Sequence, residues 1–182
     1  MAEDHPLAPH TPYAAGKASA DLQILAWCRV FGLDVAIMRP FNTYGPRMAR
    51  DGRVVIEFVT AALVNKPFPV FGDGKQTRSF CFVSDLIDGL IAAMEKGEKG
   101  EVYNLGNPQE FTILELAEKV KLLTNTTSEI SSIGSLPEDD PIRRCPDIQK
   151  AREALGWEPK VSLEEGLKKL IVYLQTIGKP RV

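Results

Sequence analysis

The first forty residues combine a well-delimited helix with a short apolar strand that follows it at once. Thr11 and Pro12 are an N-cap residue and a first-turn proline, and Gly32 suits the C-terminal end, so we predict a helix from Pro12 to Val30 or Phe31. Residues 33–38 come next, are apolar except for Asp34, and predict a short buried strand. A helix that feeds such a strand is the second half of a helix-to-parallel-strand unit, which requires a parallel sheet to pack against.

The rest of the sequence alternates between helical and strand-like segments. Apolar spacing predicts a helix over residues 53–65, one that Ser84 caps, one after a Thr112–Glu115 capping box and one after a Ser162–Glu165 capping box. Asp147 is predicted to cap a short helix that Gly156 ends. Short strands are predicted over 68–71, 80–83 and 102–105, and loops over 40–52 and 137–146. This alternation indicates an α/β protein.

Composition excludes several classes of function. The 182 residues are 44% hydrophobic and 25% charged with a formal net charge of −2, which suits one globular domain, with or without a small appendage. We therefore expect neither a nucleic-acid partner nor a membrane, and no signal peptide. Cys28, Cys81 and Cys145 lie far apart, which predicts reduced thiols and a cytoplasmic location. The histidines His5 and His10 lie in the polar leader, so we predict no metal site.

Tyr13 and Lys17 are the strongest candidates for catalysis. Residues four apart lie on one helix face, roughly 5–6 Å apart at Cβ. An ammonium at that position can stabilise a tyrosinate, a base able to take a proton from a sugar hydroxyl during hydride transfer. Taken alone, this spacing more often belongs to an ordinary amphipathic helix, and only the motifs further along the chain favour the catalytic interpretation. A dinucleotide site would have to precede this motif, and almost nothing precedes it, so we expect the second half of an enzyme.

Further motifs resemble those of the extended short-chain dehydrogenase/reductases that modify nucleotide sugars. The match runs in order along nearly the whole chain, through Glu3-Asp4-His5-Pro6-Leu7, Arg39-Pro40-Phe41-Asn42-Thr43-Tyr44-Gly45-Pro46-Arg47, Phe71-Gly72-Asp73-Gly74, Gln76-Thr77-Arg78-Ser79-Phe80, Val83-Ser84-Asp85, Tyr103-Asn104-Leu105-Gly106 and Leu155-Gly156-Trp157-Glu158-Pro159. Within that family the stretches from Gly45 to Met48, from Asp51 to Val55 and around Asp139-Asp140-Pro141 are most similar to UDP-glucuronate decarboxylases. Ala18 departs from that subfamily, which has an arginine after the lysine.

The resemblance implies a specific architecture. It predicts the C-terminal part of a Rossmann-type NAD-binding fold plus a small α/β substrate-binding subdomain, without the N-terminal βαβ units. Residues 1–52 would belong to the NAD-binding domain and residues 53–182 mainly to the sugar-binding subdomain, with helix 84–96 and strand 102–105 returning to the Rossmann domain. The family's GxxGxxG phosphate loop is absent from this sequence, and Gly72-Asp73-Gly74 reads as a turn.

The resemblance also implies roles for individual residues. Tyr13 would take the proton of the sugar 4-hydroxyl while NAD accepts the C4 hydride, and Lys17 would bind the nicotinamide ribose. Pro40 and Phe41 would form the wall beside the nicotinamide. The implied substrate-binding residues, some of which could equally serve the core or surface ion pairs, are Asn42, Arg53, Val70, Phe71, Arg78 and Arg144.

Several functions remain open from the sequence. The resemblance implies decarboxylation of UDP-glucuronate to UDP-xylose, in which oxidation at C4 places a ketone β to the carboxylate, followed by re-reduction. UDP-glucose 4-epimerases and dTDP-glucose 4,6-dehydratases share the first step. The chain alone is expected to be inactive: a remnant, a dimerisation module, or a partner of a separately encoded N-terminal half. The full-length form is expected to be a homodimer, and the resemblance implies an interface made by the Tyr13 helix and helix 84–96. The apolar side chains of the Tyr13 helix, at Ala20, Ile24, Trp27 and Phe31, could equally pack on the missing sheet.

Overall fold

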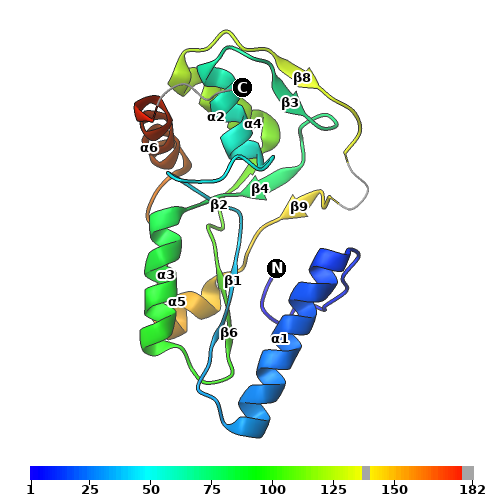
Figure 1. Ribbon diagram of the computed structural model, residues 1–182, viewed down its shortest axis with the longest axis vertical. Helices are drawn as coiled ribbons and strands as arrows, with labels where there is room; N and C mark the ends of the chain where they lie inside the picture. Colours follow the sequence, from blue (N-terminus) through cyan, green and yellow to red (C-terminus); the bar gives the residue numbers. More distant parts are fainter. Residues whose placement is uncertain (137–139, 178–182) are drawn as a thin grey trace.

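A computed structural model describes residues 1–136 and 140–177 and confirms the α/β prediction (Figure 1). In chain order the elements are α1 (Pro12–Phe31), β1 (Ile37–Pro40), β2 (Thr43–Tyr44), α2 (Val54–Leu63), β3 (Phe68–Val70), β4 (Thr77–Ser79), β5 (Cys81–Phe82), α3 (Val83–Lys96), β6 (Val102–Leu105), β7 (Glu110–Thr112), α4 (Ile113–Thr124), β8 (Ile130–Ser132), β9 (Arg143–Arg144), α5 (Gln149–Leu155) and α6 (Leu163–Thr176). Within the described residues, no helix combines the length and apolarity that crossing a bilayer needs.

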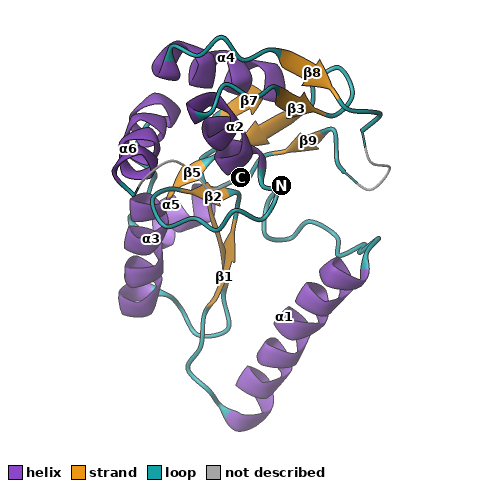
Figure 2. Cartoon of the chain, turned by 45° about the horizontal axis from the view of Figure 1, so that its top comes forward, coloured by secondary structure: helices purple, strands orange, loops and turns teal. Residues whose placement is uncertain are grey.

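The parallel pair β1–β6 organises one end of the molecule. Its register runs from Ile37 opposite Val102 to Pro40 opposite Leu105. Helices α3 and α5 pack beside it around a small cluster formed by Ala93, Tyr103, Leu105, Ile148, Ala151, Leu155 and Trp157. In both ribbon views α1 lies on the other side of β1 from α3 (Figures 1 and 2). The homodimer expected from these two helices stays a prediction.

Helix α1 has the predicted ends but little packing. The Thr11 hydroxyl accepts the Ala14 N–H at 3.1 Å, and Gly32 closes the helix at φ 68°. Among the residues of α1, all of which the structure describes, Cys28 is the one that is buried. An ion pair between Asp21 and Arg39 of β1, at 2.8 Å, ties the helix to the sheet. Most of its large apolar side chains are exposed, including those of Leu22, Trp27, Val30 and Phe31.

The larger core occupies the other end of the molecule. Helices α2, α4 and α6 contact one another, and strands β3 and β8 pair in parallel beside them. The most deeply buried side chains of this core include Tyr44, Ile56, Phe58, Val59, Phe68, Leu116, Val120, Leu167 and Leu170. Both predicted capping boxes are present, at Thr112–Glu115 and Ser162–Glu165, and they fix where α4 and α6 begin.

A three-stranded sheet with the order β7-β4-β9 joins this core to the rest of the chain. Glu110 of β7 accepts a hydrogen bond from Thr77 of β4 at 3.1 Å and is paired with Arg143 of β9 at 2.6 Å. One carboxylate of β7 therefore links the side chains of the two other strands of this sheet. The hydrogen bond from Arg143 lowers the pKa of Glu110 to about 2.

The strand predicted over residues 33–38 is placed too early in the sequence. The structure has β1 at Ile37–Pro40, because the chain meets its partner segment only after the turn at Gly32. Ile37 donates its N–H to the carbonyl of Glu101 at 2.9 Å, whereas Leu33 is exposed. A strand begins where a neighbouring strand satisfies its backbone groups, and apolar character alone does not fix that point.

Other boundaries also differ from the prediction. The loop predicted over 40–52 contains β2. Helix α3 begins at Val83 directly after β5, so Ser84 lies in the first turn of the helix and is not its N-cap. Asp147 accepts the N–H of Gln149 at 2.9 Å although Ile148 occupies the N-cap position. Of the loop predicted over 137–146, residues 137–139 lie outside the described residues and 143–144 form β9. The division of the chain near residue 52 stays a prediction, and residues 178–182 of its second part are also outside the described residues.

We predict that Gly166→Ala destabilises the fold strongly. A Cβ at position 166 of α6 would lie 2.0 Å from the hydroxyl oxygen of buried Tyr44. Overpacking of this kind costs about 1–3 kcal/mol, measurable by urea unfolding. Gly16→Ala in α1 is the matched control, because nothing lies within 4 Å of its Cβ position. The control is expected to be neutral or stabilising by up to about 1 kcal/mol. Equal effects of the two substitutions would contradict the packing described for α6.

We also predict an acid-sensitive contribution from Glu110. Its folded-state pKa of about 2 lies below the unfolded value of about 4.3, so its stabilisation is complete above pH 4.3 and disappears as the pH falls toward 2. Glu110→Gln should lower the free energy of unfolding by about 0.5–1 kcal/mol at pH 7, because Arg143 is largely exposed. The difference from the parent should shrink between pH 4.3 and 2, and a constant difference would refute the prediction. Glu95→Gln, at an exposed position of α3, serves as the control.

Candidate functional site

A cavity of about 290 Å³ brings together four of the predicted substrate-binding residues. They are Asn42, Arg53, Phe71 and Arg78, and they come from four separate segments of the chain. Apolar side chains form much of the remaining wall, among them Met48, Val54, Val55, Phe58, Pro69, Phe80 and Ile113. An apolar wall with a few polar and cationic groups suits a ligand that joins a flat ring to an anion.

Arg78 is the cation built most firmly into this cavity. It lies on β4, the central strand of its sheet, and its side chain is 8% exposed. Its guanidinium donates one hydrogen bond to the carbonyl of Thr77 at 2.7 Å and another to the carboxylate of Asp140 at 2.5 Å. A planar guanidinium fixed in this way can present its remaining N–H groups to phosphate oxygens.

Asn42 is fixed at the carboxyl end of β1. The side-chain amide of Asn42 donates to the backbone carbonyl of Ser79 at 3.1 Å. The backbone carbonyl of Asn42 accepts the N–H of Cys81 at 3.0 Å. The preceding Pro40 is exposed and Phe41 is half-buried, with the Phe41 N–H bonded to Leu105 at 2.8 Å. Neither Pro40 nor Phe41 lines the cavity.

The remaining predicted substrate residues differ in their surroundings. Arg53 stands before the first turn of α2, about half exposed and paired with Asp51 at 2.8 Å. Phe71 is 44% exposed, whereas Val70 is buried in the core and does not line the cavity. Arg144 is the register partner of Arg78 on β9 but is also absent from the lining.

The Tyr13–Lys17 pair lies apart from the cavity. Both side chains are exposed on α1, with the Lys17 ammonium 5.7 Å from the centre of the Tyr13 ring. In both ribbon views the N-terminal end of α1, which carries them, is the end nearer to β9 (Figures 1 and 2). The pair has the shared helix face that its spacing predicts, and neither residue contributes to the wall of the cavity.

Most of the other lining residues were not identified from the sequence as functional, and Gln76 and Asp140 are the two that directly hold predicted ones. Gln76 is buried, and its side-chain amide donates to the backbone carbonyl of Phe71 at 3.1 Å. This bond holds the backbone at Phe71, whose ring is exposed, in place. Asp140 reaches Arg78 across 62 positions of sequence. The Asp139-Asp140-Pro141 motif was available as a signal, but only the fold shows which cation Asp140 contacts.

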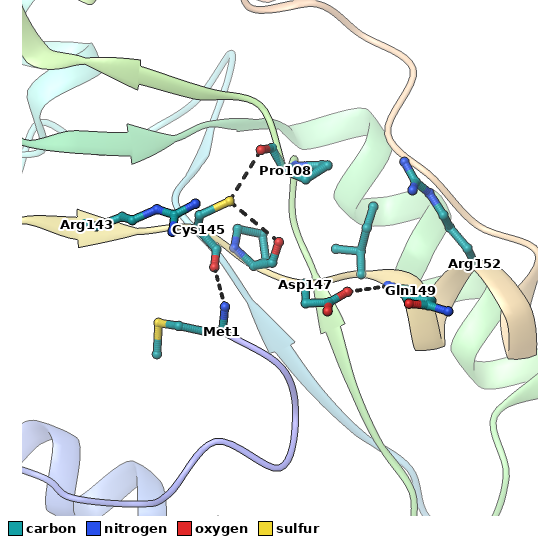
Figure 3. Close-up of a pocket in the computed structure, with 9 residues that line it drawn as sticks. Met1, Pro108, Arg143, Cys145, Asp147, Gln149 and Arg152 are labelled. Carbon is teal, nitrogen blue, oxygen red and sulfur yellow. Dashed lines mark hydrogen bonds between the residues drawn. The ribbon is translucent and has the colours of Figure 1, made fainter.

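A second cavity, of about 490 Å³, contains none of the predicted residues (Figure 3). Its cationic groups are already engaged: Arg143 with Glu110, Arg152 with Glu158 at 3.2 Å, and the Met1 amino group with the carbonyl of Cys145 at 2.9 Å. Burial and a hydrogen bond with Glu110 raise the pKa of Cys145 to about 11, which keeps the thiol neutral near pH 7. Nothing in this cavity is set up as a nucleophile or as an anion site.

Comparison with known proteins identifies relatives over most of the chain. The model of the NAD dependent epimerase/dehydratase family matches residues 1–106. UDP-glucuronic acid decarboxylase 3 of Arabidopsis thaliana is 50% identical over 164 residues, which cover 90% of this chain and 47% of the relative. UDP-glucuronic acid decarboxylase 1 of Xenopus tropicalis is 46% identical over 172 residues, covering 94% of this chain and 40% of the relative. The chain therefore spans about half, or less, of the length of these relatives.

Solved structures of nucleotide-sugar enzymes also match this chain over nearly its whole length. The UDP-glucose 4-epimerase of Thermotoga maritima, solved with UDP-glucose, matches with a TM-score of 0.93 and 34% identity over 97% of this chain and 57% of that chain. A UDP-glucuronic acid 4-epimerase of Bacillus cereus, solved with NAD and a fluorinated UDP-glucuronic acid, gives 0.91 and 30% over 97% and 56%. The fold is that of the Rossmann-type epimerases and dehydratases, and the chain belongs to the NAD dependent epimerase/dehydratase family.

Proposed function

We propose that this chain carries the sugar-nucleotide site and the Tyr–Lys pair of a UDP-glucuronate decarboxylase. The observation that carries the proposal is the cavity in which Arg78, Asn42 and Arg53 stand at the edge of an apolar wall. The guanidinium suits the diphosphate, and the apolar wall with Phe71 suits the uracil and the sugar. Identity of about 50% to curated decarboxylases supports glucuronate as the sugar.

The Tyr13–Lys17 donor set fits a nicotinamide cofactor. An exposed phenol and an exposed ammonium on one helix face can meet a ribose hydroxyl and a sugar hydroxyl together. NAD, when bound, supplies reversible hydride transfer at C4 of the sugar. Tyr13 would hold and move the proton of the 4-hydroxyl, Lys17 would hold the nicotinamide ribose, and Pro40 and Phe41 at the end of β1 would line that side.

Three other proposals concern the activity of the chain alone, its oligomeric state and its location. We propose that the 182-residue chain alone binds the nucleotide sugar without turning it over, because α1 buries so little of its surface. We retain a homodimer for the full-length form, supported by the exposed apolar side chains of α1. We also retain a cytoplasmic location, supported by three cysteines that are all free.

A 4-epimerase or a 4,6-dehydratase is the second candidate function, favoured by structural matches at 30–34% identity.

Binding tests the cavity. The chain should bind UDP in calorimetric titration, and Arg78→Ala should weaken binding at least about tenfold, because it removes a charge-assisted contact to phosphate. Arg152→Ala is the matched control, since Arg152 lies outside the cavity. Absence of UDP binding by the parent chain, or unchanged affinity after Arg78→Ala, would refute the assignment.

Turnover tests the chemistry. The chain joined to the N-terminal half of a curated decarboxylase should release CO₂ from UDP-glucuronate. Tyr13→Phe should lower kcat at least about 100-fold, because it removes the acid–base group, while Tyr173→Phe should not. Conversion of UDP-glucose to UDP-galactose, or dehydration of dTDP-glucose, in place of CO₂ release would support the second candidate. Any turnover by the 182-residue chain alone would contradict the proposal that it is inactive.

A further inference from the structure

The cation that the proposed function assigns to phosphate already has an anionic partner inside the chain. Asp140 accepts a hydrogen bond from Arg78 at 2.5 Å, and both residues line the cavity. The carboxylate therefore occupies Nη2 of the guanidinium, one of the positions that a phosphate oxygen could otherwise use, and leaves the remaining N–H groups beside a negative charge. A phosphate that used the same edge would lie next to the Asp140 charge.

The formal charges of the residues that line the cavity also fail to favour an anionic ligand. Its lining includes two cations, Arg53 and Arg78, and two anions, Glu57 and Asp140, and Arg53 is in addition paired with Asp51. The lining is therefore neutral overall, although a nucleotide diphosphate carries several negative charges. A neutral lining provides little net attraction for such a ligand unless one carboxylate gives way.

The two partners are not equally constrained. Arg78 lies on the central strand and is held by Thr77 as well, and its side chain is 8% exposed. Asp140 lies before β9 and its side chain is 38% exposed. The nearest strand contact, from the Thr77 N–H to the carbonyl of Ile142 at 2.9 Å, involves only backbone atoms. The Asp140 side chain can turn away from Arg78 without breaking the pairing of β4 with β9.

We propose that Asp140 is an internal competitor of the diphosphate, so that ligand phosphate and the Asp140 carboxylate exchange at Arg78. This inference rests on the proposed function of the cavity. It makes Asp140 a specificity-determining residue: a ligand gains access to Arg78 only when its phosphate charge outweighs that of the carboxylate. Uridine, which has no phosphate, binds without the exchange and gains nothing from it.

Calorimetric titration of the full chain and of Asp140→Asn tests the exchange. The probes are UDP, inorganic pyrophosphate and uridine at fixed ionic strength. Asn keeps the shape and can still accept a hydrogen bond from Arg78, but it removes the competing charge. UDP and pyrophosphate should bind about tenfold more tightly to Asp140→Asn, and uridine should bind equally to both proteins. Asp88→Asn removes the same charge from an exposed position of α3 outside the cavity and should change none of the three affinities.

The alternative role for Asp140 is to hold Arg78 in the orientation that phosphate needs. In that case Asp140→Asn would weaken UDP and pyrophosphate binding, which would overturn the proposal, as would unchanged affinities. If UDP binding depends on Arg78 while Asp140→Asn has no effect, the proposed function stands and the exchange fails. If none of the proteins binds UDP or uridine, the proposed function fails and the exchange fails with it. Thermal unfolding of each variant shows that the comparison is made between folded proteins.

Discussion

The position of β4 between β7 and β9 is the constraint on which the cavity depends. Arg78 faces the cavity because β4 is held on both edges by segments that follow it by 30 residues or more in sequence. Glu110 joins the three strands through Thr77 and Arg143. A group on a central strand is positioned more rigidly than one on a loop, and Arg78, the proposed phosphate-binding group, lies on such a strand.

The chain divides its functional groups between regions with different amounts of packing. The cavity adjoins a core in which side chains such as Phe58 and Val59 are fully buried. The Tyr13–Lys17 pair instead lies on a helix with one buried residue, Cys28. Under the proposed function both sets act on one sugar, so that binding depends on the first region and the chemical step depends on both. Binding needs only the well-packed region, whereas turnover also needs α1 to hold a defined orientation.

The sequence predicted those features that depend on local chemistry. Thr11 and Gly32 delimit α1, and the capping boxes at Thr112 and Ser162 start α4 and α6, because these signals act over a few residues. Strands β4, β7 and β9 were not predicted, since they lack an apolar run and their formation depends on partners far away in the sequence. The motif around Arg78 predicted the cation of the cavity. Its pairing with Asp140 could not be predicted, because a charge's partner is set by the tertiary fold.

The sparse packing of α1 has a consequence for how the molecule opens. Free energies of local opening follow the buried contacts of each segment, so the amide hydrogens of α1 should exchange with solvent sooner than those of α2 and α4. Opening of α1 breaks the Asp21–Arg39 ion pair and few apolar contacts, and it leaves the larger core intact. The helix bearing the Tyr–Lys pair can therefore open locally while the larger core and the cavity around Arg78 stay folded. A ligand that contacts both regions would stabilise that helix by an amount that the cavity alone cannot account for.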